Sequence, residues 1–395
     1  METTVSLSFS ELQSSNNESL LEEGRSCALE ATVVLDATRI EFIDSMLLYS
    51  RLQIVYIFVV IPIITSLAVI TNGSYLFVVA KTKSMHTVIN IYLCNLAVAD
   101  VLFLLSSCGI YIYYYFISGG VYANLPNAGT LDCNSSQFAN IFYVTSAILI
   151  VAVTLDRYYA VCYPLKHRMF SKTRAIKITI AAWVFAVLYR VKDVLVFWYK
   201  TRVCVIWPDL PRYSELSPVL GYCDTIFTEE VRILVVHFFD PLLFVLMMLA
   251  NSFMYFKIVK ALKNRPAQRD GQQGLSDSAD RTRRSVTRML LANSIVFFIL
   301  TAPEFIQKSL HGLQKFKVEL PPALTNVVGS HVTSITTNIL VNINSMVNPI
   351  IYNVANSRYR QAYREAFLPC RQTADRQRRK QLSGNIVATN MTVDS

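Results

Sequence analysis

Asp156, Arg157 and Tyr158 are adjacent in the chain, and they follow a run of residues without a charged side chain, 133–155. A carboxylate and a guanidinium are costly near hydrocarbon unless they pair with each other or reach water. An arginine at the end of a membrane span can do either, because its long stem lets the charged head extend to the interface. These residues therefore have the chemistry of a switch between two states of similar energy.

Asp100 is the second residue with costly chemistry, because it lies in the middle of a segment, 88–116, that has no other charged side chain. An ionisable group within a membrane span is rare, and it faces the interior of a helix bundle where polar groups stabilise it. We therefore expect polar side chains from other helices to surround Asp100.

The elements that position these residues are predicted to be membrane-spanning helices. Of the 395 residues, 53% are hydrophobic and 16% are charged, a more apolar composition than that of ordinary soluble domains. Uncharged runs such as 52–80 exceed the ~20 residues that a helix needs to cross a membrane, whereas a β-barrel would show alternating segments of ~10 residues. The apolar runs and their charged ends predict seven helices, at residues 53–80, 88–116, 134–161, 175–199, 231–258, 286–311 and 328–353.

The positions of Lys and Arg predict the orientation of these helices. Four segments hold 25 of the 37 Lys and Arg residues, namely 81–86, 157–177, 257–288 and 358–380. Because positive residues favour the cytoplasmic side, we expect a multi-pass plasma-membrane protein with an extracellular N-terminus and a cytoplasmic C-terminus.

Four parts are expected along the chain: an extracellular and mostly disordered segment at 1–52, the helix bundle at 53–356, an amphipathic helix at 357–370, and a disordered cytoplasmic tail at 371–395. Asn17 in the first part has the Asn-x-Ser pattern of a glycan acceptor. The basic face of 357–370 suits anionic membrane lipids, and Cys370 lies where a palmitoyl chain could anchor it. No nucleic-acid partner is expected.

The motifs resemble those of the rhodopsin-like (class A) G-protein-coupled receptors over residues 53–370. They occur in family order along the spans: Asn72, "NLAVAD" ending at Asp100, "DRY" at 156–158, Trp183, Pro241, Phe297 with Pro303, and "NPIIY" at 348–352. The resemblance implies an all-α membrane protein, a seven-transmembrane helix bundle with a short amphipathic cytoplasmic eighth helix. It also implies a receptor, not an enzyme, that binds an extracellular ligand and activates a heterotrimeric G protein, under the control of receptor kinases and arrestin.

The same resemblance assigns roles to the charged residues in and beside the membrane spans. It implies that Asp156 restrains Arg157 at rest, and that Arg157 with Tyr158 faces the G protein after activation. Asn348, Pro349 and Tyr352 are implied as parts of the same switch, in which the proline kinks its helix.

For Asp100, the resemblance implies a polar site with Ser146, Asn344 and Ser345. Such oxygen and amide groups suit an allosteric sodium ion. The alternative is a purely structural polar cluster between helices. No other cofactor is expected.

Among the cysteines, Cys133 resembles the family's bridge position at the outer start of the third helix. The sequence around Cys204 resembles the second extracellular loop of several peptide receptors, so the resemblance favours a disulfide between Cys133 and Cys204. Cys223 is the alternative partner. The long loop from about 200 to 230 is expected to form a hairpin lid.

Two positions depart from the family pattern. Thr301 stands where the sixth helix usually has a tryptophan, and Leu249 stands where the fifth helix usually has a tyrosine. A threonine at this position resembles the pattern of a subset of invertebrate neuropeptide receptors, which includes myosuppressin and FMRFamide-like receptors.

The resemblance also narrows the ligand. A retinal protein needs a lysine where this chain has Asn342, and an amine receptor needs a carboxylate near Ala139. The outer ends of the helices instead hold polar residues and charges of both signs, which suit a neuropeptide better than a lipid. The candidate ligand-binding residues are Glu304, Gln307, Asn140, Arg190, Asp193, His237 and Asn338.

Two alternatives remain for these residues and for the function. The charges can instead be satisfied internally, with Arg190 paired to Asp193 and Glu304 paired to Lys308. A class A receptor for a small molecule or a lipid is the second function. A transporter or channel with Asp100 on an ion path is the third, although the sequence has no detectable inverted repeat.

Overall fold

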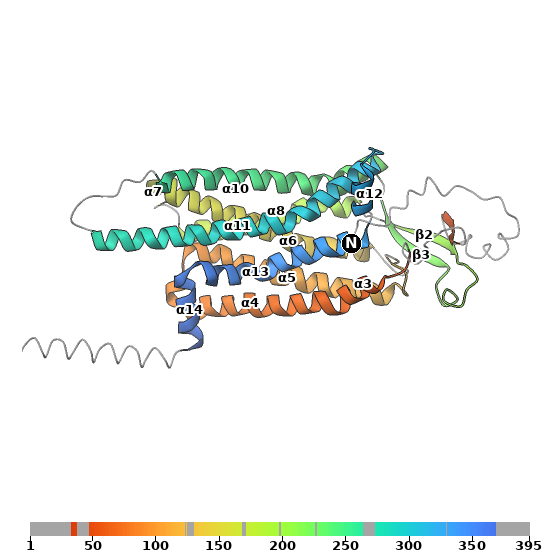
Figure 1. Ribbon diagram of the computed structural model, residues 1–395, viewed down its shortest axis with the longest axis horizontal. Coiled ribbons are helices and arrows are strands. Elements are labelled where there is room, and N and C mark those ends of the chain that lie inside the picture. Colours follow the sequence, from red (N-terminus) through yellow and green to blue (C-terminus); the bar gives the residue numbers. More distant parts are fainter. Residues whose placement is uncertain are drawn as a thin grey trace, which may run out of the picture.

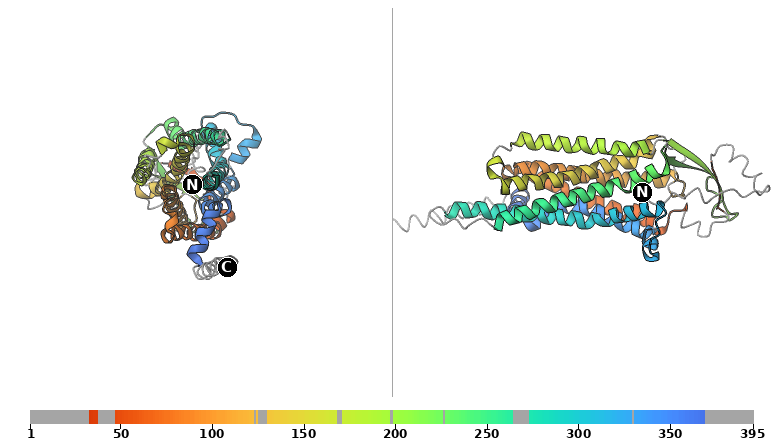
Figure 2. Two further views of the ribbon diagram at one scale, coloured as in Figure 1. Left: turned by 90° about the vertical axis from the view of Figure 1, so that its left-hand side faces the viewer. Right: turned by 90° about the horizontal axis from the view of Figure 1, so that it is seen from above.

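Long helices dominate the computed structural model, which describes residues 33–37, 47–122, 124, 130–167, 171–196, 199–225, 227–263, 273–328 and 330–368. The helices lie side by side around one axis (Figures 1 and 2). A small sheet lies at one end of the bundle, and helix α14 runs across the other end (Figure 1). We call these the sheet end and the α14 end.

The all-α, seven-helix architecture predicted from the sequence is confirmed. The seven helical segments are α3 with η3 and α4 (Arg51–Val55, Tyr56–Val60 and Ile61–Lys81), α5 (Val88–Ile117), α6 (Thr130–Cys162), α8 (Lys172–Val196), α9 with α10 (Glu229–His237 and Phe239–Lys263), α11 (Gln273–Lys315) and α13 (His331–Ala355). Short helices lie in the connections: η4 (Lys83–Met85), α7 (Pro164–His167) and α12 (Pro322–Val328).

Length and hydropathy alone identify five of these segments, within the described residues, as candidate membrane spans. The other two, α8 and α13, are more polar. Charged residues interrupt α8 near Arg190, and Asn, Ser and Thr recur along α13. Both helices contribute buried polar side chains to the bundle interior, so their polarity has a use inside the protein.

The fifth membrane segment is divided at Phe238, where α9 ends and α10 begins. Pro241 lies in the first turn of α10. A proline is tolerated there because the first backbone N–H groups of a helix have no partner within it. Pro241 therefore begins a helix near the sheet end.

The sheet has three strands, β1 (Val33–Asp36), β2 (Tyr199–Ile206) and β3 (Val219–Asp224), with β2 in the centre. Strands β2 and β3 are antiparallel, which confirms the expected hairpin, and β1 pairs with β2 in parallel. Leu35 and Leu220 are buried in a small apolar core of the sheet. Part of the segment 1–52 is thus ordered as a strand on the hairpin lid.

Helix α14 (Ser357–Phe367) follows α13 at the α14 end. The Asn356 side chain caps it by accepting a hydrogen bond from the Arg358 amide at 3.0 Å. Tyr359, Ala362 and Ala366 form its buried face, and Lys81 donates a hydrogen bond to the Ala366 carbonyl at 2.7 Å. The amphipathic helix predicted at 357–370 is therefore packed against α4.

Candidate functional site

A cleft opens between the helices toward the sheet end and holds about 1040 Å³ of empty space, counted with its open mouth. Six of the seven residues predicted to bind the ligand line it, namely Asn140, Arg190, His237, Glu304, Gln307 and Asn338. They come from α6, α8, α9, α11 and α13, so the cleft exists only when the helices are assembled. The seventh residue, Asp193, does not line the cleft and instead binds Arg190.

Three acidic and three basic side chains form one ion-pair network, and four of the six line the cleft. Both internal pairs that the sequence suggested are present: Arg190 Nη1 lies 3.0 Å from Asp193 Oδ2, and Lys308 Nζ lies 2.9 Å from Glu304 Oε1. Lys192 joins the network at 2.8 Å from Asp193. Because the acids balance the bases, the network is neutral before any ligand binds.

Asp240 connects the two internal pairs and was missed in the sequence. Its carboxylate lies 3.0 Å from Arg190, 3.3 Å from Lys192 and 3.9 Å from Lys308, and it accepts a hydrogen bond from the Tyr189 hydroxyl at 3.0 Å. A carboxylate in the first turn of a membrane helix was the signal that could have revealed it, since a buried charge requires partners.

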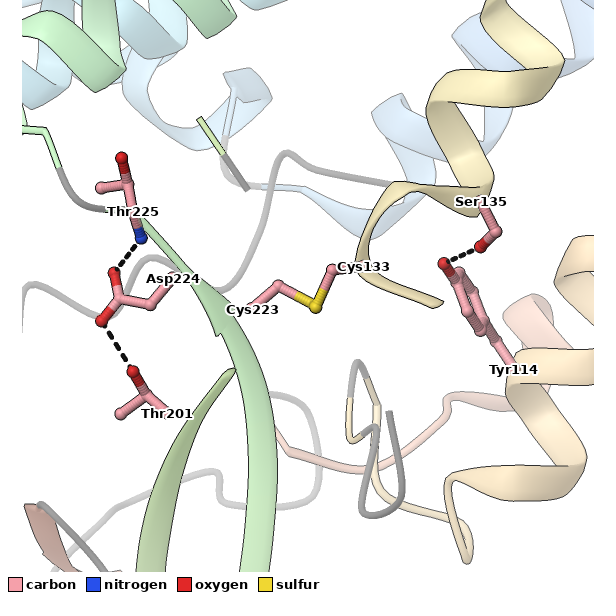
Figure 3. Close-up of a disulfide and its surroundings, with 7 residues drawn as sticks. All are labelled: Tyr114, Cys133, Ser135, Thr201, Cys223, Asp224 and Thr225. Atoms are coloured by element: carbon pink, nitrogen blue, oxygen red, sulfur yellow. Dashed lines mark hydrogen bonds between the residues drawn. A yellow bond between two sulfur atoms is a disulfide. The ribbon is translucent and has the colours of Figure 1, made fainter. Parts of the chain in front are cut away.

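The disulfide that holds the hairpin to the bundle corrects the sequence-based prediction. Cys133 at the start of α6 is bonded to Cys223, not to Cys204, with a Cα–Cα distance of 5.6 Å (Figure 3). In the strand register, Cys223 is next to the base of the hairpin, whereas Cys204 is opposite Val219 at the far end of β3. Cys204 is itself disulfide-bonded. The position of each cysteine along the hairpin thus decides the pairing.

Asp100 is fully buried at the centre of the bundle, as expected for an ionisable residue in the middle of an otherwise uncharged segment. It accepts hydrogen bonds from Ser146 at 2.8 Å and from the Asn348 amide at 2.6 Å. Asn344 and Ser345 are buried nearby on α13. The Oδ1 atoms of Asn344 and Asn348 are buried and have no hydrogen-bond partner among the described residues, so the residues present fit a small cation.

Asp156 and Arg157 lie at the α14 end of α6 and form the predicted pair. Arg157 Nη2 donates to Asp156 Oδ2 at 3.1 Å, while His167 Nε2 lies 3.3 Å from Asp156 Oδ1. The Asp156 side chain is almost completely buried. His167, on the short helix α7, was not singled out in the sequence, because nothing in its spacing shows that α7 folds back onto α6.

Comparison with known proteins identifies the family that shares this architecture. The family model "7 transmembrane receptor (rhodopsin family)" matches residues 71–352. The chain belongs to this family. Its members are receptors and not enzymes.

Several relatives of this receptor are named for peptides. The Tachykinin-like peptides receptor 86C of Drosophila melanogaster is 26% identical over 60% of this chain and 45% of its own length. Somatostatin receptor type 5 of Rattus norvegicus is 30% identical over 60% and 58%, and Neuromedin-U receptor 2 of Homo sapiens is 26% identical over 70% and 63%. The chain therefore spans between 45% and 63% of these relatives' length.

The missing helix-five tyrosine of the receptor is supplied from another position. Leu249, at the expected spacing from Pro241, is exposed on the outside of the bundle. Tyr255, six residues further along α10, is buried and forms hydrogen bonds with Thr154 on α6 at 3.3 Å and with Ser294 on α11 at 3.2 Å. Pro241 therefore does not mark the family position, because it begins α10 nearer the sheet end.

The missing helix-six tryptophan leaves a different aromatic contact in the receptor. Thr301 is fully buried and donates a hydrogen bond to the Phe297 carbonyl of its own helix at 2.7 Å. Tyr143 of α6 packs against Phe297 and Phe305 of α11, with ring centroids 6.5 and 6.4 Å apart. The third and sixth membrane helices thus remain in aromatic contact.

Tyr352 is almost completely buried near the α14 end of the receptor, three residues after Pro349 on α13. Its ring packs against Tyr75 of α4 and Tyr359 of α14, with centroids 5.4 and 5.8 Å away. The hydroxyls of Tyr75 and Tyr359 both donate to Asn90 Oδ1. Burial raises the pKa of Tyr359, so its phenol remains a neutral donor. A movement of Tyr352 must therefore disturb the packing of α14.

Proposed function

We propose that the receptor binds a peptide in the cleft at its sheet end and activates a heterotrimeric G protein at its α14 end. The observation that supports a peptide is the neutral network of three acids and three bases, four of which line the cleft. A charged ligand can exchange partners with such a network, whereas an apolar lipid would leave the cleft's polar groups without compensation.

Glu304 is the best candidate for a basic group of the peptide. Its partner Lys308 also lies 3.9 Å from Asp240. When Glu304 turns to an incoming ammonium or guanidinium group, Lys308 therefore keeps an acidic partner. The side-chain amides of Gln307, Asn140 and Asn338, which line the cleft, offer hydrogen bonds to the peptide backbone nearby.

The chemistry of the two ends supports the proposed orientation in the membrane. A disulfide between Cys133 and Cys223 suits the oxidising extracellular side. At the α14 end, a groove between α10, α11 and α14 is lined by basic residues that favour the cytoplasmic side of a plasma membrane, namely Lys263, Arg284, Arg288 and Arg358. Both features support the proposed orientation, with the N-terminus outside and the C-terminus inside a multi-pass receptor.

The groove at the α14 end is the proposed G-protein site. Arg157 is the residue proposed to face the G protein once Asp156 releases it, with Tyr158, Asn348, Pro349 and Tyr352 as parts of the same rearrangement. Arrestin and receptor kinases are proposed to act on the tail 371–395, and membrane lipids on the basic face of α14. The tail, Asn17 and Cys370 lie outside the described residues.

A sodium ion is proposed as an allosteric partner of Asp100. Asp100, Ser146, Asn344 and Ser345 would hold it, and the unpaired Oδ1 atoms of the neighbouring amides support this. When bound, sodium supplies a positive charge that compensates the buried carboxylate.

The test is a screen of neuropeptides on cells that express the receptor with a promiscuous G-protein reporter. We expect at least one peptide to activate wild type and the control Lys172→Ala, whose side chain is exposed at the α14 end, and to leave Arg157→Ala silent at equal surface expression. Full signalling by Arg157→Ala would overturn the proposed mechanism.

A further inference from the structure

Two histidines meet where helix α9 touches helix α11, and one of them, His237, lines the cleft. The ring centroids of His237 and His311 are 5.1 Å apart, and the ring planes are inclined by 52°. His237 is 6% exposed and lines the cleft. The two rings belong to different membrane segments, so anything that binds both joins those segments.

One ring nitrogen of each histidine has no hydrogen-bond partner within the described residues. The Nδ1 atoms of His237 and His311 are both buried, and neither has a hydrogen-bond partner within the described residues. A buried polar nitrogen without a partner is unusual and costly. These two nitrogens can therefore bind a ligand that accepts one lone pair from each of two neutral imidazoles.

The spacing of the rings matches a shared metal ion. Zinc binds imidazole nitrogen at ~2.0–2.1 Å in tetrahedral geometry, which puts the centroids of two imidazoles on one zinc ion about 5 Å apart. A direct hydrogen bond between the rings would instead have satisfied at least one of the two nitrogens.

We infer that His237 and His311 bind one Zn²⁺ ion from the extracellular side and that this ion cross-links the outer ends of the fifth and sixth membrane segments. No cluster of three or more His, Cys, Asp or Glu ligands exists in the described part of the chain, so water completes the coordination. A site with two protein ligands binds zinc more weakly and more reversibly than a structural site with four.

Acids partly balance the three basic groups around the site, although Arg232 and Lys315 share the same acid, Glu229. On α11, Lys308 pairs with Glu304, and Lys315 lies within Coulomb range of Glu229. On α9, Arg232 pairs with Glu229. A divalent cation therefore enters a region of opposed charges.

Gly312 explains why the rings come so close. A Cβ atom at this position would lie 2.7 Å from His237 Cβ and 2.7 Å from the Phe238 ring. Only glycine allows α9 and α11 to approach here, and the adjacent His311 is carried against His237 by that contact.

The test is zinc binding to the purified full-length receptor in lipid nanodiscs, without a polyhistidine tag, measured by competition with a fluorescent zinc indicator. Wild type should bind one Zn²⁺, and His237→Ala or His311→Ala should each weaken binding at least about tenfold. His331→Ala is the matched control, because His331 already contacts Gln53 at 3.3 Å, and it should bind like wild type.

A further variant separates zinc binding from a structural role of the histidines. His311→Cys should bind zinc clearly better than His311→Ala, because a thiolate is also a zinc ligand. Zinc should raise the melting temperature of wild type, His331→Ala and His311→Cys, but not that of His237→Ala or His311→Ala. Binding that survives both alanine variants, or His311→Cys that binds no better than His311→Ala, would overturn the inference.

Discussion

Asp240 has more charged partners than any other residue in the cleft wall, and its neutralisation is the sharpest test of the network. Asp240→Asn leaves Arg190, Lys192 and Lys308 with two acids, so a buried positive charge loses its compensation. Removing one partner of a buried ion pair costs about 3–5 kcal/mol. We expect a marked fall in the melting temperature of the purified receptor, followed by tryptophan fluorescence.

The matched control for Asp240→Asn is Glu229→Gln. Glu229 pairs with Arg232, but its side chain is 51% exposed, and exposed pairs contribute only about 0–1 kcal/mol. Equal losses of stability in the two variants would show that Asp240 does not connect the network.

The site residues that could be predicted from the sequence are those whose burial in a membrane would cost free energy without a partner. Asp100, Asp156 and Arg157 are charges in or beside apolar runs, so each had to have a partner or a function. Asp240 and His167 escaped because their partners come from other helices and connections, and the sequence alone does not say which side chains meet there. The same limit hid the substitution of Tyr255 for the expected tyrosine.

At the scale of the helices, the contact at Gly312 controls how closely α9 and α11 pack. Gly312→Ala would place a Cβ within 2.7 Å of the Phe238 ring, and overpacking of this kind costs about 1–3 kcal/mol. We expect a lower melting temperature and faster hydrogen exchange at the sheet end of α11.

Gly73→Ala is the control, because it also replaces a helical glycine but meets no atom within 4 Å. Alanine is the better helix former by roughly 0.5–1 kcal/mol, so this variant should be as stable as wild type or more stable. A Gly312→Ala receptor as stable as Gly73→Ala would contradict the close packing.

The disulfide makes a separate prediction about the hairpin lid. Cys133→Ser and Cys223→Ser should lower surface expression equally, and the double variant should be no worse than either, because both remove the same bond. Cys204→Ser combined with Cys133→Ser should be worse than either single variant, since Cys204 belongs to another bond. Surface expression is measured by flow cytometry of an N-terminal epitope tag. Additive losses for Cys133 and Cys223 would contradict the pairing.

Most of the elements were predictable because a membrane helix needs a long apolar run, and five of the seven helical segments have one within the described residues. The details that depend on contacts between distant segments were not. The division of the fifth segment at Phe238 and the parallel pairing of β1 with β2 have no local signal. The choice of Cys223 over Cys204 depends on the hairpin register, which the sequence leaves open.

On the scale of the whole molecule, the two ends are connected through buried polar groups along the bundle axis. The cleft network, the Asp100 centre and the Asp156–Arg157 pair are at successive levels of the same bundle, and α6 contributes to each of the last two. A ligand at the sheet end can shift the receptor between states only if the states differ in their affinity for it. The proposed difference at the α14 end is the position of Arg157.

The most direct test is nucleotide exchange on a purified G-protein heterotrimer by the full-length receptor in nanodiscs, without any ligand. Asp156→Asn removes the charge that holds Arg157, so it should raise basal exchange above that of wild type, and His167→Ala should raise it by less. Adding Arg157→Ala to Asp156→Asn should return exchange to the level without receptor. Exchange by the double variant equal to that of Asp156→Asn alone would contradict the central role of Arg157.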